Sequence, residues 1–447
     1  ARSGSEGRRE GGRRLGEDRH RPALLVDPHL ERRVAEARRA EERRRAEAAR
    51  LAAVARNEEL RERVQSMIAK DDLTGEDPEI RRVALNALGN HAGTVVVMNP
   101  QTGRVYSIVN QQWALREGFK PCSTIKLVTT VAGLNEAVID PNDTTKISDN
   151  NQVSLTRALA YSTNPYFQTV GEQVGFEKMV AYARRLGLGE KTGINARNEF
   201  QGRVPGADSF RAIHRMSSHG DHYEVTALQL ATLVSAIGNG GKLLRPYVVR
   251  SRQDESKFKT KVRRQVNVGR DLWSHVVPGM VGAVNYGSGK RAHDAQQQVA
   301  GKTGTCIENG TWVGLFTSYA PVLNPKLAVV VITRGADARG HFPAAVAGRI
   351  YRELGNQHGA STGLHVASRT VDTLENDDEE ETVLEEEAEF KLQTATVFRS
   401  DQANPSKVKP VLMSIPMPRE VEKPATRPGD EPGITGGQTR PRRVLGE

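Results

Sequence analysis

The sequence predicts an α+β domain with an antiparallel β-sheet over residues 84–360 of the 447-residue chain. Patterns typical of strands stand near both ends of this region, at 93–109 and 298–333, and patterns typical of helices fill the stretch between them. Strands grouped in this way around a helical stretch favour an antiparallel sheet with helices packed on it.

The first two strands form a predicted hairpin. Apolar residues at 93–97 and 104–109 flank the turn sequence Asn99-Pro-Gln-Thr-Gly103, whose residue types favour a tight turn. The helical patterns then cover residues 123–138, 154–161, 164–174, 176–186 and 226–239. Further strands fit 298–305, 311–319 and 326–333, and a closing helix fits 343–354.

The flanks of this domain have a different composition. Residues 1–27 are mostly Arg, Gly and Glu, and we expect a disordered basic leader there. Residues 28–83 begin with a long stretch of Ala, Arg and Glu, which predicts a helical spacer. Residues 361–447 contain an acidic run, 371–389, with 11 acidic and no basic residues, and then a Pro-rich stretch. We expect a disordered tail there.

The net charge of +10 does not by itself indicate a nucleic-acid-binding protein, because residues 1–63 carry a net +5 and the acidic run 371–389 opposes it with a net −11. Residues 1–63 contain 18 Arg against 13 acidic residues. We interpret the Arg-rich helix as a solvated spacer, with lipid-headgroup or partner binding as the alternative. Apolar runs stay far below the ~20 residues of a membrane span.

Three short motifs follow one another in the predicted domain: Ser123-Thr-Ile-Lys126, Ser162-Thr-Asn164 and Lys302-Thr-Gly304. In the first, Pro121 and the apolar run after Lys126 place Ser123 at the start of a buried helix. Positions i and i+3 share a helix face, so Lys126 can take the proton that makes Ser123 a nucleophile. Lysines serve as bases when burial and nearby positive charge lower their pKa. A solvated serine and lysine on a helix face are the alternative.

The second motif stands before Pro165, a favoured first residue of a helix. Helix capping explains one polar residue at such a place. The functional interpretation instead gives Ser162 a proton-relay role and Asn164 a hydrogen bond to a substrate amide.

The third motif lies on a predicted edge strand. Lys302 and Gly304 share one face of this strand, and Thr303 and Thr305 share the other. Such a strand can pair with an extended substrate, and Gly304 permits close approach. Lys302 and the threonine hydroxyls would receive a carboxylate, and the backbone N–H groups of Ser123 and Thr305 would form an oxyanion hole. A plain edge strand with a solvated lysine is the alternative.

With these motifs the chain resembles the transpeptidase domain of penicillin-binding proteins. The likeness extends to the segments 155–167, 186–194 and 225–241 and covers about residues 84–360. The resemblance implies an antiparallel sheet of about five strands flanked by helices, with the nucleophile beside an all-helical half. It also implies catalytic roles for Ser123, Lys126, Ser162, Asn164 and Lys302.

The chain departs from the related class A β-lactamases after Asn164, where their deacylating Glu is absent. Glu199, in the sequence Asn198-Glu-Phe-Gln-Gly202, resembles a penicillin-binding-protein segment instead. Without a carboxylate that activates water, fast hydrolysis of an acyl-enzyme is disfavoured. A lysine-based deacylation, as in class D β-lactamases, stays open.

The two cysteines of the chain stand beside the motifs. Cys122 occupies the position before the nucleophile, where the family usually has Gly, and Cys306 lies two residues past Gly304. This placement resembles the bridge in some carbapenem-hydrolysing class A β-lactamases and implies a Cys122–Cys306 disulfide. Two buried thiols are the alternative, and Cα atoms more than ~7 Å apart would exclude the bridge.

Four potential metal ligands cluster in one loop: His214, His219, Asp221 and His222. The family has no metal there and no second set of ligands is evident, so we expect neither a metal nor a cofactor.

The resemblance therefore predicts an extracytoplasmic, periplasmic D-Ala-D-Ala transpeptidase or carboxypeptidase that acts on peptidoglycan stem peptides through a Ser123 acyl-enzyme. β-Lactam antibiotics would acylate the same serine. Two alternatives stay open: a β-lactamase, and a non-enzymatic penicillin-binding sensor or cell-wall scaffold. The flanks would suit cell-wall or division proteins as partners, and work outside the cytoplasm implies that an anchor or signal precedes Ala1.

Overall fold

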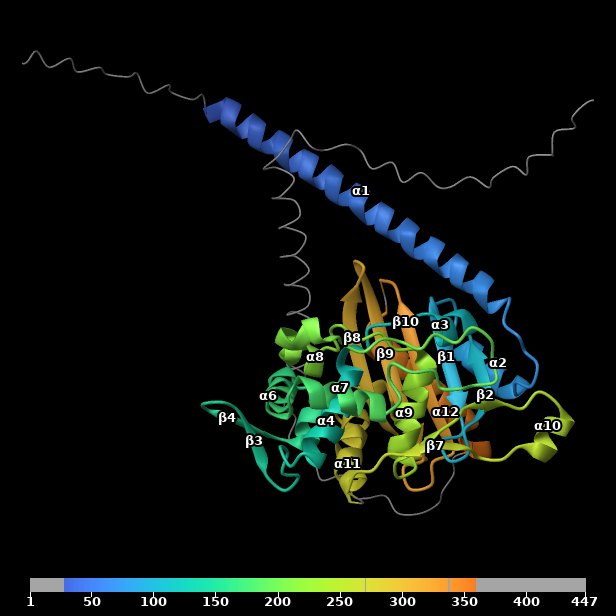
Figure 1. The fold of residues 1–447 in the computed structure, drawn as a ribbon. Helices are drawn as coiled ribbons and strands as arrows, with labels where there is room; N and C mark the ends of the chain where they lie inside the picture. Colours follow the sequence, from blue (N-terminus) through green and yellow to red (C-terminus); the bar gives the residue numbers. More distant parts are fainter. Residues whose placement is uncertain (1–27, 270, 337, 359–447) are drawn as a thin grey trace, which may run out of the picture. The chain divides into compact units, whose positions relative to one another are not determined.

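The computed structural model describes residues 28–269, 271–336 and 338–358. The leader 1–27 and the tail 361–447, for which the sequence predicts disorder, lie outside the described residues. The described part has the predicted α+β architecture, with one large sheet and helices packed against it (Figure 1).

The large sheet contains six strands in the order β6-β2-β1-β10-β9-β8. Five of them pair antiparallel, as predicted, and the two-residue β6 adds a parallel pairing to β2. The strand bounds are β1 Gly93–Met98, β2 Arg104–Val109, β6 Tyr247–Val248, β8 Ala300–Glu308, β9 Thr311–Ala320 and β10 Leu327–Arg334. The motif strand β8 ends the order of strands and is therefore an edge strand, as the sequence predicts.

The centre of the sheet is apolar on both faces. Val96 of β1 pairs with Val330 of β10, and both side chains are fully buried. Unbroken Val-rich runs are typical of strands covered on both sides. Helices α9 (Ala227–Gly238) and α12 (His341–His358) provide the cover, one in front of the sheet and one behind it in Figure 1. Helix α2 (Pro78–Leu88) packs beside α12.

A helical half lies next to β8 and carries the first two motifs. Its helices are α4 Lys126–Asn135, α5 Leu155–Tyr161, α6 Asn164–Val174, α7 Phe176–Arg185, α8 Ile213–Ser218 and α11 Leu272–Asn285. The sequence patterns do not predict α11, because Pro278 and two glycines disfavour a helix. Burial of its apolar side chains against α5 and β8 overrides that preference.

Shorter elements complete the described part: α3 Gln111–Arg116, η1 Cys122–Ile125, β3 Thr144–Ser148, β4 Asn151–Ser154, η2 Ala207–Ala212, β5 Lys242–Leu244, α10 Arg252–Lys257, β7 Val262–Gln265 and η3 Lys290–Ala292. Strands β3 with β4 and β5 with β7 form two small antiparallel pairs.

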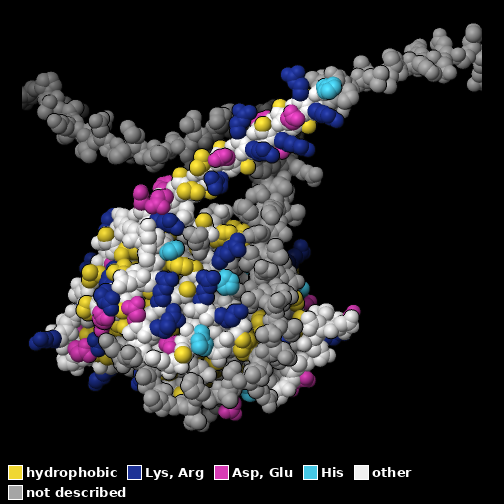
Figure 2. Space-filling model, turned by 180° about the vertical axis from the view of Figure 1, so that it is seen from behind, with side chains coloured by type: hydrophobic (Ala, Val, Ile, Leu, Met, Phe, Trp, Pro, Cys, Tyr) yellow, Lys and Arg dark blue, Asp and Glu magenta, His cyan; other side chains and the backbone are white. Residues whose placement is uncertain are grey.

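The predicted spacer 28–83 differs from the structure in two ways. Helix α1 (Pro28–Ile68) is exposed over residues 32–56, where basic and acidic side chains alternate (Figure 2), but its last turns bury Leu60, Val64 and Ile68 in the core. The predicted boundary at residue 84 falls inside α2, which Asp77 caps. The spacer thus ends as part of the folded domain. Among the described residues, helices are too short or too polar to cross a membrane.

Candidate active site

The first motif lies where the short 3-10 helix η1 continues into α4. Ser123 is the second residue of η1 and is 5% exposed, and Lys126 begins α4 and is fully buried. The apolar run after Lys126 places α4 in the core, so the nucleophile candidate stands at the buried start of a helix. The alternative of a solvated serine and lysine is wrong.

Lys126 points at the second motif. Its Nζ donates to Ser162 Oγ at 2.8 Å, to Asn164 Oδ1 at 2.6 Å and to the Ser162 carbonyl oxygen. The ammonium also lies 5.4 Å from the centre of the Phe167 ring. These contacts replace water for a buried ammonium group, which is costly to bury without partners.

Ser162 joins α5 to α6 in a left-handed conformation, with φ of +63°. This conformation is unfavourable for a residue with a side chain, and such residues often mark functional sites. Thr163 holds the N-cap position of α6 and makes no capping side-chain bond, and the Asn164 side chain accepts from Lys126. The second motif therefore does not serve as a helix cap.

Lys302 approaches the same serine from β8. It is fully buried, and its Nζ donates to Ser162 Oγ at 2.9 Å and to the Thr303 carbonyl oxygen at 3.2 Å. The alternative of a solvated lysine on a plain edge strand is wrong. The three motifs thus converge on one hydroxyl group, with a lysine on either side of it.

This arrangement defines what the Ser162 hydroxyl can still do. A hydroxyl group accepts two hydrogen bonds and donates one. When both lysines donate to Ser162 Oγ, its own proton is the remaining group that can face a substrate. Ser162 can pass that proton on and recover another from a lysine, which is the geometry of a proton relay.

The threonines of the third motif have different partners. Thr303 Oγ1 pairs with Ser288 Oγ at 2.7 Å, and Thr305 Oγ1 accepts from the Gly340 N–H at 2.8 Å. The sequence did not predict Ser288 or Gly340 as neighbours of the motif. A side chain at Gly304 would lie 3.1 Å from the Pro121 carbonyl oxygen, so this glycine permits close packing of β8 on η1.

A disulfide joins Cys122 to Cys306, with 5.7 Å between the Cα atoms. It links η1 to β8 directly beside Ser123 and Thr305. Cys122 has a φ of +48°, a conformation that glycine adopts at no cost. The disulfide explains why this position has a cysteine although its positive φ favours glycine.

The carboxylate of Glu199 binds groups of a neighbouring turn and is therefore not available as a water-activating base. Its carboxylate accepts from the Thr192 N–H at 2.7 Å, from the Thr192 hydroxyl at 2.5 Å and from the Gly193 N–H at 3.1 Å. It holds the 192–193 turn, which is a structural use of a buried carboxylate.

The candidate metal ligands have other partners. His214 Nε2 lies 3.3 Å from a Glu172 oxygen, and Asp221 pairs with Lys120 at 2.6 Å and Arg215 at 2.7 Å. Within the described ranges, groups of three side chains that could hold a metal ion are absent.

His219 follows α8 as its C-cap residue and is buried. Its Nδ1 lies 2.7 Å from Ser218 Oγ. Burial, and then the positive charge of Lys126, lower the pKa of His219 to about 3. The imidazole is therefore neutral at physiological pH and adds no further positive charge beside the lysine.

Comparison with solved structures identifies the fold. The transpeptidase domain of penicillin-binding protein 3 from Burkholderia pseudomallei matches with a TM-score of 0.57 at 20% identity, over 63% of this chain and 95% of that domain. Pseudomonas aeruginosa PBP2, in complex with WCK 5153, matches with a TM-score of 0.57 at 21% identity, over 64% of this chain and 80% of that one. The fold is that of a penicillin-binding protein transpeptidase domain.

The sequence places the chain in the same group. Residues 93–354 match the family described as penicillin binding protein transpeptidase domain, and the chain belongs to this family. Curated relatives include the peptidoglycan D,D-transpeptidase MrdA of Acinetobacter baumannii, 23% identical over 57% of this chain and 50% of the relative. The peptidoglycan D,D-transpeptidase PbpA of Mycobacterium tuberculosis is 27% identical over 62% of this chain and 70% of the relative.

Stage V sporulation protein D of Bacillus subtilis is 25% identical over 57% of this chain and 47% of its own length. The chain spans about half the length of MrdA and about half the length of stage V sporulation protein D. The likeness therefore establishes the family of the domain, and the resemblance read from the three motifs is confirmed.

Proposed function

We propose that the chain is a peptidoglycan D,D-transpeptidase that works outside the cytoplasm, where its substrate lies. The observation that carries the proposal is the Ser162 hydroxyl, which accepts from Lys126, three residues after Ser123, at 2.8 Å and from Lys302 at 2.9 Å. The names of the relatives support the same reaction class.

In the proposed acylation, Ser123 Oγ attacks the carbonyl carbon of the penultimate D-Ala of a stem peptide. Lys126, in its neutral amine form, takes the serine proton, and a C–O bond forms as the carbonyl π bond opens. Proton transfer by a positioned group of this kind contributes about 10²- to 10⁴-fold to the rate. The backbone N–H groups of Ser123 and Thr305 would hold the developing oxyanion, at about 3 kcal/mol per donor.

The tetrahedral intermediate then collapses. The C–N bond to the terminal D-Ala breaks, and Ser162 gives a proton to the departing amine while a neighbouring lysine restores it. Ser123 keeps the peptide as an ester. An amine from a second stem peptide attacks this ester, gives up one proton to the same relay and releases Ser123, so that the two strands are cross-linked.

β-Lactams would follow the first half of this path. Their strained amide presents a carbonyl to Ser123, and the ring opens to an ester whose amine stays attached. The carboxylate of the ligand would face Lys302 and Thr305. Because the leaving amine cannot diffuse away, the acyl-enzyme persists until water removes it.

Hydrolysis of β-lactams is the second candidate function, favoured by the Cys122–Cys306 bond and its likeness to that of some β-lactamases. The placement of Glu199 speaks against it, because its carboxylate is occupied by the Thr192 and Gly193 amides. Transpeptidation therefore stays the leading proposal.

One pair of assays distinguishes transpeptidation from β-lactam hydrolysis. With a chromogenic cephalosporin, a transpeptidase gives a burst of one product per enzyme and a β-lactamase gives many turnovers. With a stem pentapeptide and a D-amino acid acceptor, a transpeptidase releases D-Ala and forms the exchanged peptide. Ser123→Ala serves as the control in both. Turnover of the cephalosporin without any release of D-Ala would overturn the proposal, and acylation without either reaction would indicate a sensor.

A further inference from the structure

One buried serine outside the three motifs is bonded to the helix before the second motif and to the strand of the third. Ser288 lies between Gly287 and Gly289, in the turn between α11 and η3, and is 4% exposed. Its backbone N–H donates to the carbonyl oxygen of Ala160 in α5 at 3.1 Å. Its Oγ pairs with Thr303 Oγ1 in β8 at 2.7 Å. Ser288 therefore joins the end of α5 to β8.

These contacts close a ring of five residues that includes the proposed proton relay. Ala160 stands two residues before Ser162, and Thr303 directly follows Lys302. Lys302 Nζ donates to Ser162 Oγ at 2.9 Å. Ser288 thus holds the same two segments that the bond between Lys302 and Ser162 joins. Each of the five residues is at most 5% exposed, so their polar groups depend on one another for partners.

The turn between α11 and η3 has little room to move. The N–H of Gly287 donates to the Gly282 carbonyl oxygen at 3.0 Å, and the N–H of Gly289 donates to that of Ala283 at 2.8 Å. The last turn of α11 therefore holds both sides of the turn. A side-chain carbon at Gly287 would lie 2.1 Å from the Ala160 carbonyl oxygen. The turn is thus packed directly on the end of α5, and such close packing fixes its position.

The motif strand β8 needs support of this kind, because an edge strand has a neighbouring strand on one side alone. The disulfide ties β8 to η1 at Cys306, four residues after Lys302. The bond between Thr303 and Ser288 ties the strand to the turn one residue after Lys302. This bond therefore restrains β8 next to the lysine that contacts the second motif.

We propose that Ser288 is a positioning residue that holds the Lys302 ammonium group in contact with the Ser162 hydroxyl. The backbone of Ser288 is fixed on α5, and its hydroxyl restrains β8 through Thr303. Ser288 acts through these neighbours and does not itself touch the reacting atoms. The proposal rests on the proposed function in so far as the contact between Lys302 and Ser162 serves acylation of Ser123.

The test compares Ser288→Ala with a matched variant of the full chain. Ser288→Ala keeps the backbone N–H that donates to Ala160 and removes the hydroxyl. Ser107→Ala, on β2, is the control, because Ser107 is also buried and also loses a hydrogen bond, to Glu76 at 2.8 Å. Three strands separate β2 from β8 in the sheet. The readout is the acylation rate constant with a fluorescent penicillin, separated from the constant for initial binding.

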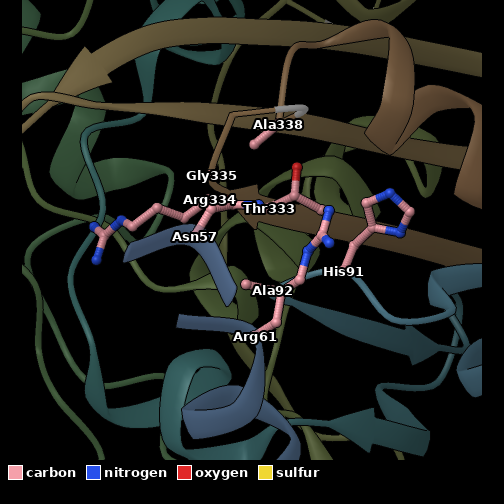
Figure 3. Close-up of a pocket in the computed structure, with 8 residues that line it drawn as sticks. All are labelled: Asn57, Arg61, His91, Ala92, Thr333, Arg334, Gly335 and Ala338. Atoms are coloured by element: carbon pink, nitrogen blue, oxygen red, sulfur yellow. The ribbon is translucent and has the colours of Figure 1, made fainter. Parts of the chain in front are cut away.

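A second pair of variants tests the partner hydroxyl. Thr303→Val removes the oxygen with which Ser288 pairs. Thr333→Val, on β10, removes a buried hydroxyl that has no hydrogen-bond partner among the described residues. Figure 3 shows Thr333 at a hollow beside Asn57 and Arg61 of α1, and the residues that line this hollow include no motif residue. Thr333→Val thus makes the same chemical change as Thr303→Val at a place outside the site.

Loss of one hydrogen bond predicts a roughly fivefold lower acylation rate constant for Ser288→Ala. Ser107→Ala and Thr333→Val should acylate like the wild type. In the Thr303→Val background, Ser288→Ala should cost almost nothing further, because the partner is already lost. A rate constant like that of the wild type in Ser288→Ala, or an equal loss in Ser107→Ala, would overturn the proposal.

A second double-mutant cycle tests whether the effect reaches the relay. Ser162→Ala lacks the oxygen to which Lys302 donates, so adding Ser288→Ala should leave its acylation rate constant unchanged. A fivefold loss in that background too would refute a role through this contact. If the wild type takes no penicillin, the proposed function fails. Urea unfolding of Ser288→Ala, Thr303→Val and the double variant then tests the pairing itself, and additive losses of stability would overturn it.

Discussion

Removal of the Cys122–Cys306 bond should lower the stability of the domain strongly. The two residues are 184 positions apart, and closing a loop of that length contributes about 5 kcal/mol in the chain-entropy treatment of the unfolded state. We therefore expect Cys122→Ser with Cys306→Ser to lose about that much unfolding free energy. The bond joins η1 to β8, so its loss should also loosen the contact between the first and third motifs.

A second variant separates the bond from the backbone at Cys122. Its φ of +48° costs a residue with a side chain about 1 to 2 kcal/mol relative to glycine. Cys122→Gly with Cys306→Ser should thus be about 1 kcal/mol more stable than the double serine variant. Urea unfolding of the oxidised protein, the reduced protein and both variants measures these differences. A loss below about 1 kcal/mol on breaking the bond would refute the reasoning.

Three further predictions concern the site and its surroundings. Ser162→Ala removes the oxygen to which Lys126 and Lys302 both donate, and we expect acylation by a fluorescent penicillin to slow by about 10²- to 10³-fold and the unfolding free energy to fall by about 1 to 3 kcal/mol; a rate like that of the wild type would exclude the relay. Glu199→Gln should lower the unfolding free energy by about 1 to 3 kcal/mol, because its carboxylate accepts backbone N–H groups, and should leave deacylation unchanged; slower deacylation would reveal a base. Burial, and then the charge of Lys126, lower the pKa of His219 from 6.5 to about 3. The unfolded chain therefore binds this proton below pH 6.5 and the folded chain does not, so stability falls by about 1.4 kcal/mol per pH unit from pH 6.5 towards pH 3. His219→Gln should remove this part of the slope in urea unfolding between pH 7 and 4.5, and equal slopes would contradict it.

The local geometry of each motif was predictable from the sequence, whereas the convergence of the three motifs was implied by the resemblance to the transpeptidase domain of penicillin-binding proteins. Ser123 and Lys126 share a helix face by their spacing, and a Pro after Asn164 marks the helix start that presents Ser162. The alternation of β8 places Lys302 and Gly304 on one face of the strand, but local sequence does not show that this face meets the other two motifs. Sequence patterns also predict the central strands, since Val-rich runs such as that of β10 are buried on both faces.

Features that depend on distant contacts were not predictable. Helix α11 contains Pro278, and its packing against α5 decides its conformation. Thr303 finds its partner in Ser288, a small polar residue between two glycines that gives only a turn signal. The docking of Asn57 on Ala336 joins residues 279 positions apart, and local sequence carries no trace of such a pair.

Detection of the acyl-enzyme tests most directly whether Ser123 is the nucleophile. Intact-protein mass spectrometry after incubation with benzylpenicillin, followed by peptide mapping, measures both the number of adducts and the residue that carries them. We predict one penicilloyl group per chain, on Ser123, and none in Ser123→Ala. An adduct on another residue, or an equal adduct in Ser123→Ala, would contradict the assignment of the nucleophile.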